Sequence, residues 1–280
     1  MERACRHDIA SISRQLGYTP KPRVQANILA VPEAARCAHG FPQAFVYHPF
    51  GDKPSSGGCR LSCPLLVSVV DRLEIDGGGL RHFRRRLKAS RTWRSRLHAT
   101  NVAHAAHRCS AVTQPEAAAA REALGTEFTA KLLTNGVAGM TVTEPDDETR
   151  THDAKCLHAQ LADWLCRVRG GHGDPVHIDP AEARWVGRAV AAAAAAAVRD
   201  SGGDGGIGSG TARLRLPEEE MGEEEWPLDG LRGEGLRCWT ACDPAHVAQA
   251  GDFVYEPQHN QIKLMHRRRR RNAQKNTSIQ

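Results

Sequence analysis

Residues 59–74 have the sequence CRLSCPLLVSVVDRLE, and the change of pattern inside this stretch decides the fold. The first residues, up to Cys63, have the composition of a short strand. Pro64 suits the first position of a helix, where its missing N–H costs no hydrogen bond. From there on, apolar residues recur at positions i, i+3, i+4 and i+7, which is typical of one apolar helix face; they are Leu66, Val69, Val70 and Leu73. The stretch therefore predicts a strand that passes directly into a helix.

The segments around this stretch predict an α+β fold, in which a small N-terminal antiparallel sheet packs on a helical remainder. Strand composition appears twice more before it, in residues 23–31 and 43–50. Helical patterns cover residues 7–17, 115–134, 154–168 and 181–200. We expect one domain over residues 8–199, a Gly-rich and acidic linker over 200–225, and a disordered C-terminal tail over 226–280 that contains a run of five arginines.

The composition indicates a modest core and an uneven charge. Only 5% of the 280 residues are aromatic and 40% are hydrophobic, so the core must depend on Leu, Val and Ala. The net charge is +6, yet residues 77–115 contain nine Lys or Arg and no acid, whereas residues 218–225 contain six Glu. Blocks of one sign indicate a polyanionic partner or a targeting signal rather than a fold.

The nine cysteines and the N-terminal residues indicate the compartment. The first residues, MERACRHDIASISRQ, lack the apolar core of a secretory signal, and the longest apolar run, AVAAAAAAAV, is too short for a membrane span. An odd number of cysteines without such a signal favours a reducing compartment with free or metal-bound thiols. We therefore expect an intracellular protein, cytoplasmic or nuclear, with no membrane partner; the sequence does not fix its oligomeric state.

Two cysteines fall where helices are predicted to begin. Cys63 directly precedes Pro64, and Cys156 would lie in the first turn of a helix with Asp153 as its N-cap. The first turn of a helix offers unpaired N–H groups and the positive end of the helix dipole, which favour the thiolate form of a cysteine. Thiolate is the form that binds metals and attacks electrophiles, so both positions are candidates for chemistry.

Five segments of the chain, in a fixed order, carry a resemblance to a known family: DIASISRQLG, ARCAHGFPQ, LSCPLLVSVVDRLE, NGVAGM and AKCLHAQLADWL. The chain resembles an uncharacterised, mostly bacterial family known as domain of unknown function 501, and the resemblance covers about residues 8–190. It implies a shared α+β fold and places the recurring thiols on Cys37, Cys63 and Cys156, with His158 beside the last. It implies no activity. The chain departs from the family pattern at SSGGCR, where the family usually has an aromatic-rich run.

The leading hypothesis is a metal-supported domain held by Cys37, Cys63, Cys156 and His158. Three thiols and an imidazole fit zinc, and three thiolates with an open iron fit an iron–sulfur cluster. Because residues i and i+2 of a regular helix point about 200° apart, Cys156 and His158 can share an ion only if Cys156 precedes the helix. The alternatives are buried structural thiols or a reactive thiol. Cys59 is expected to be incidental, since an extended CRLSC would separate it from Cys63 by about 13 Å.

Two other function classes stay open. The first is a thiol or metal-cluster enzyme at the same cysteines, in which Arg36 and His39 would bind an anionic substrate. The second is a nucleic-acid-associated protein that uses the tail and an Arg-rich helix. The basic residues of that helix are Arg84, Arg85, Arg86, Lys88, Arg91, Arg94 and Arg96. The alternative for this segment is a solvated helix face whose apolar residues, Phe83, Leu87, Trp93 and Leu97, turn inward.

Overall fold

The computed structural model describes residues 3–17, 20–51, 54, 57–75, 79–147, 149–150, 152–167, 179–200, 242, 243 and 245. The predicted linker after residue 200 and most of the predicted tail lie outside the described residues, as does the arginine run.

A three-stranded antiparallel sheet forms from the first third of the chain, as predicted. Its strands are β1 (Ile28–Ala30), β2 (Ala44–Tyr47) and β3 (Cys59–Leu61), with β2 in the centre. Every residue of β2 is buried, because elements cover both faces of the sheet. The first strand is shorter than predicted, since Pro22 begins the short helix α2 (Pro22–Gln25), a position for which its fixed φ is suited.

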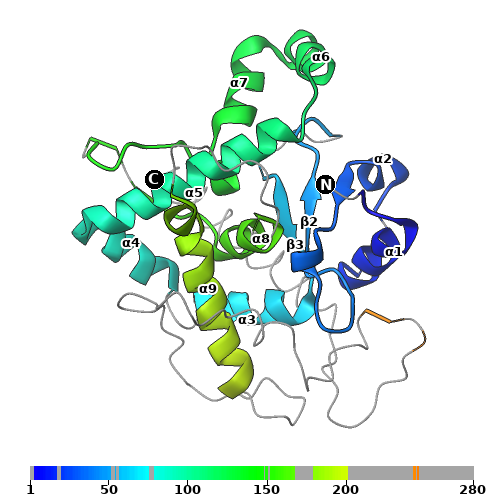
Figure 1. The fold of residues 1–280 in the computed structure, drawn as a ribbon, viewed down its shortest axis with the longest axis horizontal. Helices are drawn as coiled ribbons and strands as arrows, with labels where there is room; N and C mark the ends of the chain where they lie inside the picture. The colour runs from blue at the N-terminus through cyan, green and yellow to red at the C-terminus, as the bar shows by residue number, and fades with distance from the viewer. Residues whose placement is uncertain are drawn as a thin grey trace, which may run out of the picture.

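Helices make up the rest of the fold, and α8 (Leu157–Arg167) lies at the centre of the molecule (Figure 1). The sheet and α9 both pack against α8, and α5 packs against α9. The other helices are α1 (Arg6–Gln15), α3 (Pro64–Ile75), α4 (Gly79–Ala89), α5 (Arg91–Ser110), α6 (Gln114–Leu124), α7 (Thr126–Thr134) and α9 (Pro180–Asp200), with 3₁₀ turns at Glu33–Ala35 and Val137–Gly139. The predicted α+β class is therefore confirmed.

The two larger parts of the core lie on opposite faces of the sheet. The larger part surrounds α8, whose Leu157, Leu161 and Leu165 are fully buried and whose Trp164 is 1% exposed. The smaller part packs α1 against the opposite face of the sheet; its buried members are Ile12, Ile28, Val31, Phe45 and Tyr47. Because α8 is buried over most of its length, a charged group on its buried part must find its partner inside the protein.

The predicted helix over residues 115–134 is wrong in one respect, because the chain forms two helices there. Gly125 has φ +85°, a left-handed conformation that ends α6 and lets α7 start in a new direction. Thr113 caps α6 in a capping box with Glu116. The two helices project from the rest of the fold as a hairpin (Figure 1).

The Arg-rich segment forms α4 and α5, with its apolar residues turned inward. Phe83 and Leu87 are fully buried, and Trp93 and Leu97 are nearly so. The ring of Trp93 lies edge-on to Phe83 at 5.3 Å and to Trp185 of α9 at 4.6 Å. The expectation that these four apolar residues turn inward is confirmed, and the two aromatic residues between the arginines belong to the core.

Candidate functional site

The first candidate site lies where α8 begins beside the end of α3. Helix α8 starts at Leu157, so Cys156 precedes the helix and lies outside its regular turn. The backbone N–H of Leu157 donates to Oε1 of Glu74, at 2.6 Å. The prediction that Asp153 caps this helix is wrong, since Asp153 instead forms an ion pair with Arg84, at 2.6 Å. A carboxylate from α3 therefore stabilises the start of α8.

Cys156, His158 and Glu74 converge at this point. Sγ of Cys156 lies 3.8 Å from Nδ1 of His158, which lies 3.2 Å from Oε1 of Glu74. The three donor atoms all lie within 4.8 Å of one another, and all three residues are half-buried. Because Cys156 precedes the helix, the geometric objection to sharing an ion with His158 does not apply.

His158 is held on both ring nitrogens by carboxylates of α3. Its Nε2 lies 3.0 Å from Oδ1 of Asp71, while its Nδ1 faces Glu74. Burial lowers the pKa of His158, but the hydrogen bonds to Asp71, Cys156 and Glu74 outweigh it and raise the pKa to about 11. Burial raises the pKa of Glu74, and His158 outweighs it, so that this pKa is lowered. In the absence of metal, the site is an ion-pair network that ties α3 to α8.

Cys37 and Cys63, the other two predicted ligands, do not belong to this group of donors in the described part of the chain. Cys63 is buried directly before α3, where its N–H donates to the carbonyl of Gln43, at 3.1 Å. Cys37 is half-buried in a tight turn closed by its N–H and the carbonyl of Phe41, at 3.0 Å, and burial raises the pKa of its thiol. Of the four predicted ligands, the structure thus brings two together, with Glu74 as a third donor that sequence reasoning missed.

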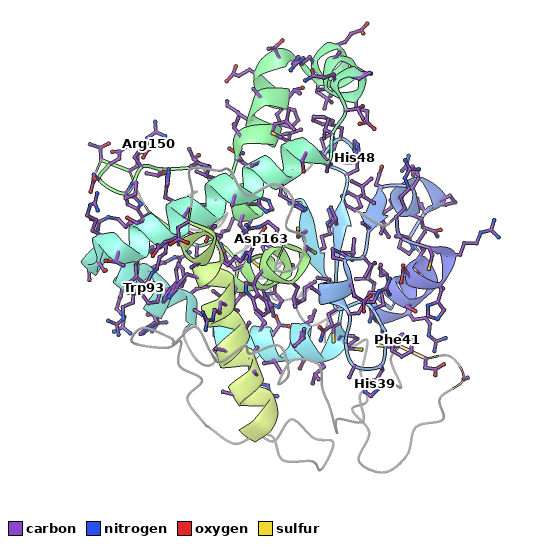
Figure 2. All side chains as sticks on the ribbon, viewed as in Figure 1. His39, Phe41, His48, Trp93, Arg150 and Asp163 are labelled. Atoms are coloured by element: carbon purple, nitrogen blue, oxygen red, sulfur yellow. The ribbon has the colours of Figure 1, made fainter. Side chains whose placement is uncertain are left out.

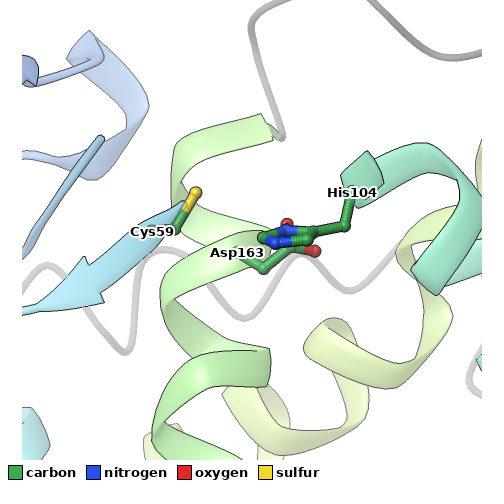
Figure 3. Close-up of side chains that lie close together, drawn as sticks. All are labelled: Cys59, His104 and Asp163. Carbon is green, nitrogen blue, oxygen red and sulfur yellow. The ribbon is translucent and has the colours of Figure 1, made fainter. Parts of the chain in front are cut away.

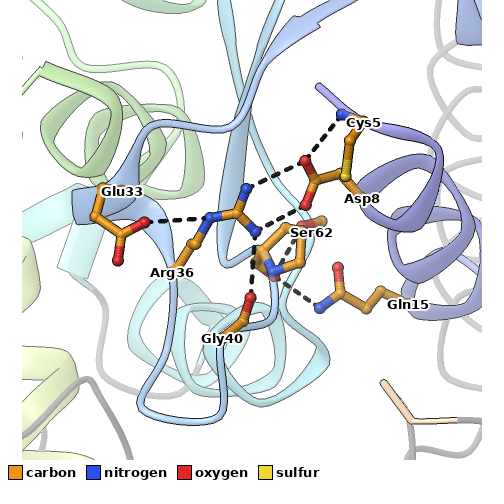
Figure 4. A network of polar contacts seen from close by, with 8 residues as sticks. Cys5, Asp8, Gln15, Glu33, Arg36, Gly40 and Ser62 are labelled. Atoms are coloured by element: carbon orange, nitrogen blue, oxygen red, sulfur yellow. Dashed lines mark hydrogen bonds and ion pairs between the residues drawn. The ribbon is translucent and has the colours of Figure 1, made fainter. Parts of the chain in front are cut away.

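Arg36, proposed above to bind an anionic substrate, already has an anionic partner. Its guanidinium donates to both carboxylate oxygens of Asp8, at 2.7 and 3.1 Å, and to the carbonyl of Gly40, at 3.2 Å (Figure 4). Burial raises the pKa of Asp8, but the bonds from Arg36 and Cys5 outweigh it and lower the pKa. The pair fastens α1 to the turn that carries Cys37, which is a structural role.

The basic side chains of α4 and α5 are largely engaged within the protein. Besides Arg84, the guanidinium of Arg91 pairs with Asp146 at 2.6 Å, and Arg94 donates to the carbonyl of Pro145 at 2.7 Å. Arg96 lies over the ring of Trp185, at 4.3 Å. Four of the seven predicted phosphate-binding residues therefore contact the loop after the second 3₁₀ turn or the start of α9. The other three predicted residues are Arg85, Arg86 and Lys88 of α4.

A second candidate site lies in the core, where Cys59 of β3, His104 of α5 and Asp163 of α8 meet (Figure 3). All three residues are buried, and Asp163 lies at the centre of the molecule (Figure 2). Nδ1 of His104 lies 2.6 Å from Oδ1 of Asp163, and Nε of Arg167 donates to the same oxygen at 2.8 Å. Sequence reasoning missed this site because its members are far apart in the chain, and the expectation that Cys59 is incidental did not anticipate these neighbours.

The charges around the core site oppose a metal ion, although its three donors lie within 4.8 Å. Asp163 is already bound by Arg167 and His104, and two further basic residues, His107 and Arg108, are buried beside it. Burial lowers the pKa of Arg108 to about 10, so that this side chain stays cationic at neutral pH. A divalent cation placed among these groups would be repelled, whereas a thiolate would be stabilised.

One hollow lies in the surface between α5 and the start of α9, away from both thiol sites. It has a volume of about 460 Å³ and is lined by residues that include Arg91, His98, Asp179 and Glu182. Since its walls hold no thiol, it offers no direct access to either cysteine cluster. None of the helices in the described part of the chain combines the length and apolar character needed to cross a bilayer.

Comparison with known proteins identifies the family but no activity. No curated protein and no solved structure matches the chain significantly. The family model described as "Protein of unknown function (DUF501)" matches residues 33–176, which include β2, β3, α3–α8 and every donor of both sites. The chain therefore belongs to the DUF501 family.

Proposed function

We propose that the protein is a metal-supported domain that binds one zinc ion through Cys156, His158 and Glu74. The observation that carries the proposal is the convergence of a thiol, an imidazole nitrogen and a carboxylate oxygen within 4.8 Å, at a point where the chain is fixed by α3 and α8. Sulfur, nitrogen and oxygen at such spacings are the donors that tetrahedral zinc takes. The ion would replace the proton of His158 and keep α3 joined to α8.

The surroundings of His158 support this assignment. When Nδ1 binds a metal, Nε2 carries the proton, and its donation to Asp71 at 3.0 Å would fix the ring orientation. Such a carboxylate behind a ligating histidine is the usual support of a zinc site. The side chains of His158 and Glu74 are 18% and 19% exposed, so that solvent can reach the site. Water would therefore fill the fourth coordination position of the zinc ion. Bound water of this kind is also what an enzyme at this site would use.

Zinc is favoured over an iron–sulfur cluster at this site because of the donor set. The group contains one thiol, whereas iron–sulfur clusters are held mainly by several thiolates. Nucleic-acid binding by α4, α5 and the tail stays a weaker proposal, since at least four of the seven basic side chains of α4 and α5 have partners within the protein. A strong fall of affinity with salt would be its signature.

The test is zinc binding by the full chain after removal of metal with a chelator. We expect about one zinc per chain, with a rise in melting temperature on reloading. Cys156→Ser should weaken binding by more than about 100-fold, and Asp71→Asn, which acts through His158, by about 10- to 100-fold. Cobalt in place of zinc should give a thiolate charge-transfer band that disappears in Cys156→Ser.

Cys109→Ser is the matched control, because Cys109 is an exposed thiol on α5 that belongs to neither group of donors. It should bind zinc with unchanged affinity. If the chain binds no zinc, or if Cys156→Ser binds it as tightly as the unmodified chain, the proposal is wrong. Brown protein that contains iron and sulfide would also contradict it and favour a cluster.

A further inference from the structure

We propose that Cys59 and Cys166 are a redox-active dithiol that hydrogen peroxide oxidises to a disulfide, with Arg108 orienting the peroxide. This inference uses the core site alone and does not depend on zinc at Cys156.

The first observation behind this proposal is that the two cysteines lie next to each other in the core. Sγ of Cys59 lies within 4.8 Å of a carboxylate oxygen of Asp163 on α8. Cys166 follows Asp163 by three residues on the same helix, and residues three apart share a helix face. Both cysteines belong to the same buried cluster, their thiols are in hydrogen-bond contact, and both are free. A disulfide would therefore join β3 to α8 inside the core.

The two thiols differ in reactivity because of what surrounds each. Hydrogen bonds from Cys166 and His107 lower the pKa of Cys59 against the effect of burial. Burial raises the pKa of Cys166, which stays a thiol. Burial lowers the pKa of His107, but the contact with Cys59 outweighs it and raises the pKa. Cys59 is thus the attacking thiolate and Cys166 the resolving thiol.

Arg108 supplies the peroxide-binding edge. Its Nη1 donates to the carbonyl of Leu132, but Nε and Nη2 are buried and have no hydrogen-bond partner in the described part of the chain. Nε and Nη2 form the edge of a guanidinium that donates two parallel hydrogen bonds. Leaving such donors unpaired in a core is costly, which indicates that the edge faces a ligand. Peroxide oxygens beside a thiolate meet this requirement.

Gly58 lies beside this edge and precedes Cys59 in the chain. A Cβ at this position would lie 3.7 Å from Nε of Arg108 and 3.6 Å from Cε1 of His104, in ordinary van der Waals contact with both. The edge therefore lies close to the backbone that carries the attacking thiolate. Because Cys59 and Cys166 are only 5% and 3% exposed, the oxidant must be small, and hydrogen peroxide is the small oxidant that the donors suit.

The reaction balances with these groups alone. The Cys59 thiolate attacks one peroxide oxygen, the O–O bond breaks, and the leaving hydroxide takes a proton from His107, which gives water and a sulfenic acid on Cys59. The sulfur of Cys166 then attacks the sulfur of Cys59. The S–O bond breaks as the S–S bond forms, and the departing hydroxide takes the proton of Cys166. The two sulfurs together lose two electrons, and one peroxide becomes two waters.

The first test compares thiols in the unmodified chain. The folded protein is treated with limiting hydrogen peroxide, the remaining thiols are alkylated, and peptides are analysed by mass spectrometry. We expect a Cys59–Cys166 disulfide to appear before oxidation of Cys109, although Cys109 is exposed. Oxidation of Cys109 first, with Cys59 and Cys166 still reduced, would overturn the proposal.

Variants test the separate roles. Cys166→Ser should stop at the sulfenic acid, trapped by dimedone on Cys59, and Cys59→Ser should leave Cys166 reduced. Arg108→Lys keeps the charge but loses the two-donor edge, so that oxidation of Cys59 should slow by about 10- to 100-fold. Circular dichroism must show each variant folded. Cys156→Ser should react as the unmodified chain does, which separates this site from the zinc site; an unchanged rate in Arg108→Lys would remove Arg108 from the mechanism.

Discussion

At the scale of single residues, Asp163 is a buried acid that is held by two basic side chains. It is 1% exposed, its two oxygens accept hydrogen bonds from Arg167, and its Oδ1 also lies 2.6 Å from Nδ1 of His104. Burial raises the pKa of Asp163, but Arg167 and His104 outweigh it, so that the pKa in the folded state lies below its ordinary value. A carboxylate held in this way makes folding depend on pH.

Because the folded pKa is depressed, the stabilisation by Asp163 is fully present above the unfolded pKa of about 3.9 and is lost as pH falls further. Asp163→Asn should lower the free energy of unfolding by about 3–5 kcal/mol at pH 7, since it leaves Arg167 buried without its counter-charge. Urea unfolding at pH 7, 5 and 3 should show the difference between variant and unmodified chain shrinking toward pH 3. Glu127→Gln, at an exposed site on α7, is the control: it removes only an i,i+4 ion pair with Lys131 and should change the free energy of unfolding far less than Asp163→Asn does. A difference that stays constant with pH would contradict this role.

At the scale of elements, the contact of α8 with α9 depends on one glycine. Gly187 lies where α9 crosses α8, and a Cβ there would lie 2.3 Å from Cβ of Trp164 and 2.9 Å from the carbonyl oxygen of Gln160. Neither of these atoms is the end of a flexible side chain, so the helices would have to separate. The close approach is why a residue of poor helix propensity is found inside a helix.

Gly187→Ala should therefore destabilise the protein by about 1–3 kcal/mol, although alanine is the better helix former. Thermal or urea unfolding measures the change, with α-helix content checked by circular dichroism. Ala192→Gly, at a half-buried position of the same helix, gives the size of the propensity effect alone, about 1 kcal/mol. If Gly187→Ala raised the melting temperature, the close packing of α8 and α9 would be wrong.

At the scale of the whole molecule, stability is distributed unevenly around α8. Every residue of α8 except His158 and Ala159 is buried, whereas α6 buries only Ala117 and Ala120, and α7 only Thr129 and Leu132. Helices with few buried apolar side chains open at low free energy. The hairpin of α6 and α7 should thus open without the rest of the fold.

Native-state hydrogen exchange should show this difference directly. We expect the amides of α6 and α7 to exchange on the order of 100-fold faster than those of α8 and α9. Truncating the exposed Phe128 of α7 to Ala should leave the exchange of α8 unchanged, since Phe128 is 47% exposed. Equal protection in the two regions would mean that the hairpin is part of the cooperative core.

The sequence by itself determined the elements that depend on local pattern. The strand-to-helix change at Pro64, the antiparallel sheet, the helix starting near Cys156 and the inward-facing Phe83 and Trp93 all follow from spacing and from proline geometry, because these effects act within a few residues. The position of Cys156 near the start of a helix was predictable for the same reason, whereas the expectation for His158 came from the family resemblance. Local pattern failed at Gly125, where a positive φ ends the helix, and at Asp153, which pairs with Arg84 and does not cap α8. Spacing in the sequence specifies neither the backbone conformation nor the partner.

Only the tertiary structure decided which distant groups meet. Glu74 reaches His158 because α3 packs beside the start of α8, and Cys59 meets His104, Asp163 and Cys166 because β3, α5 and α8 share one core. Likewise, the arginines of α4 and α5 have partners because the loop after the second 3₁₀ turn folds back on them. Such contacts depend on packing between elements far apart in the chain, and packing is set by the shape and volume of the whole core rather than by any local sequence.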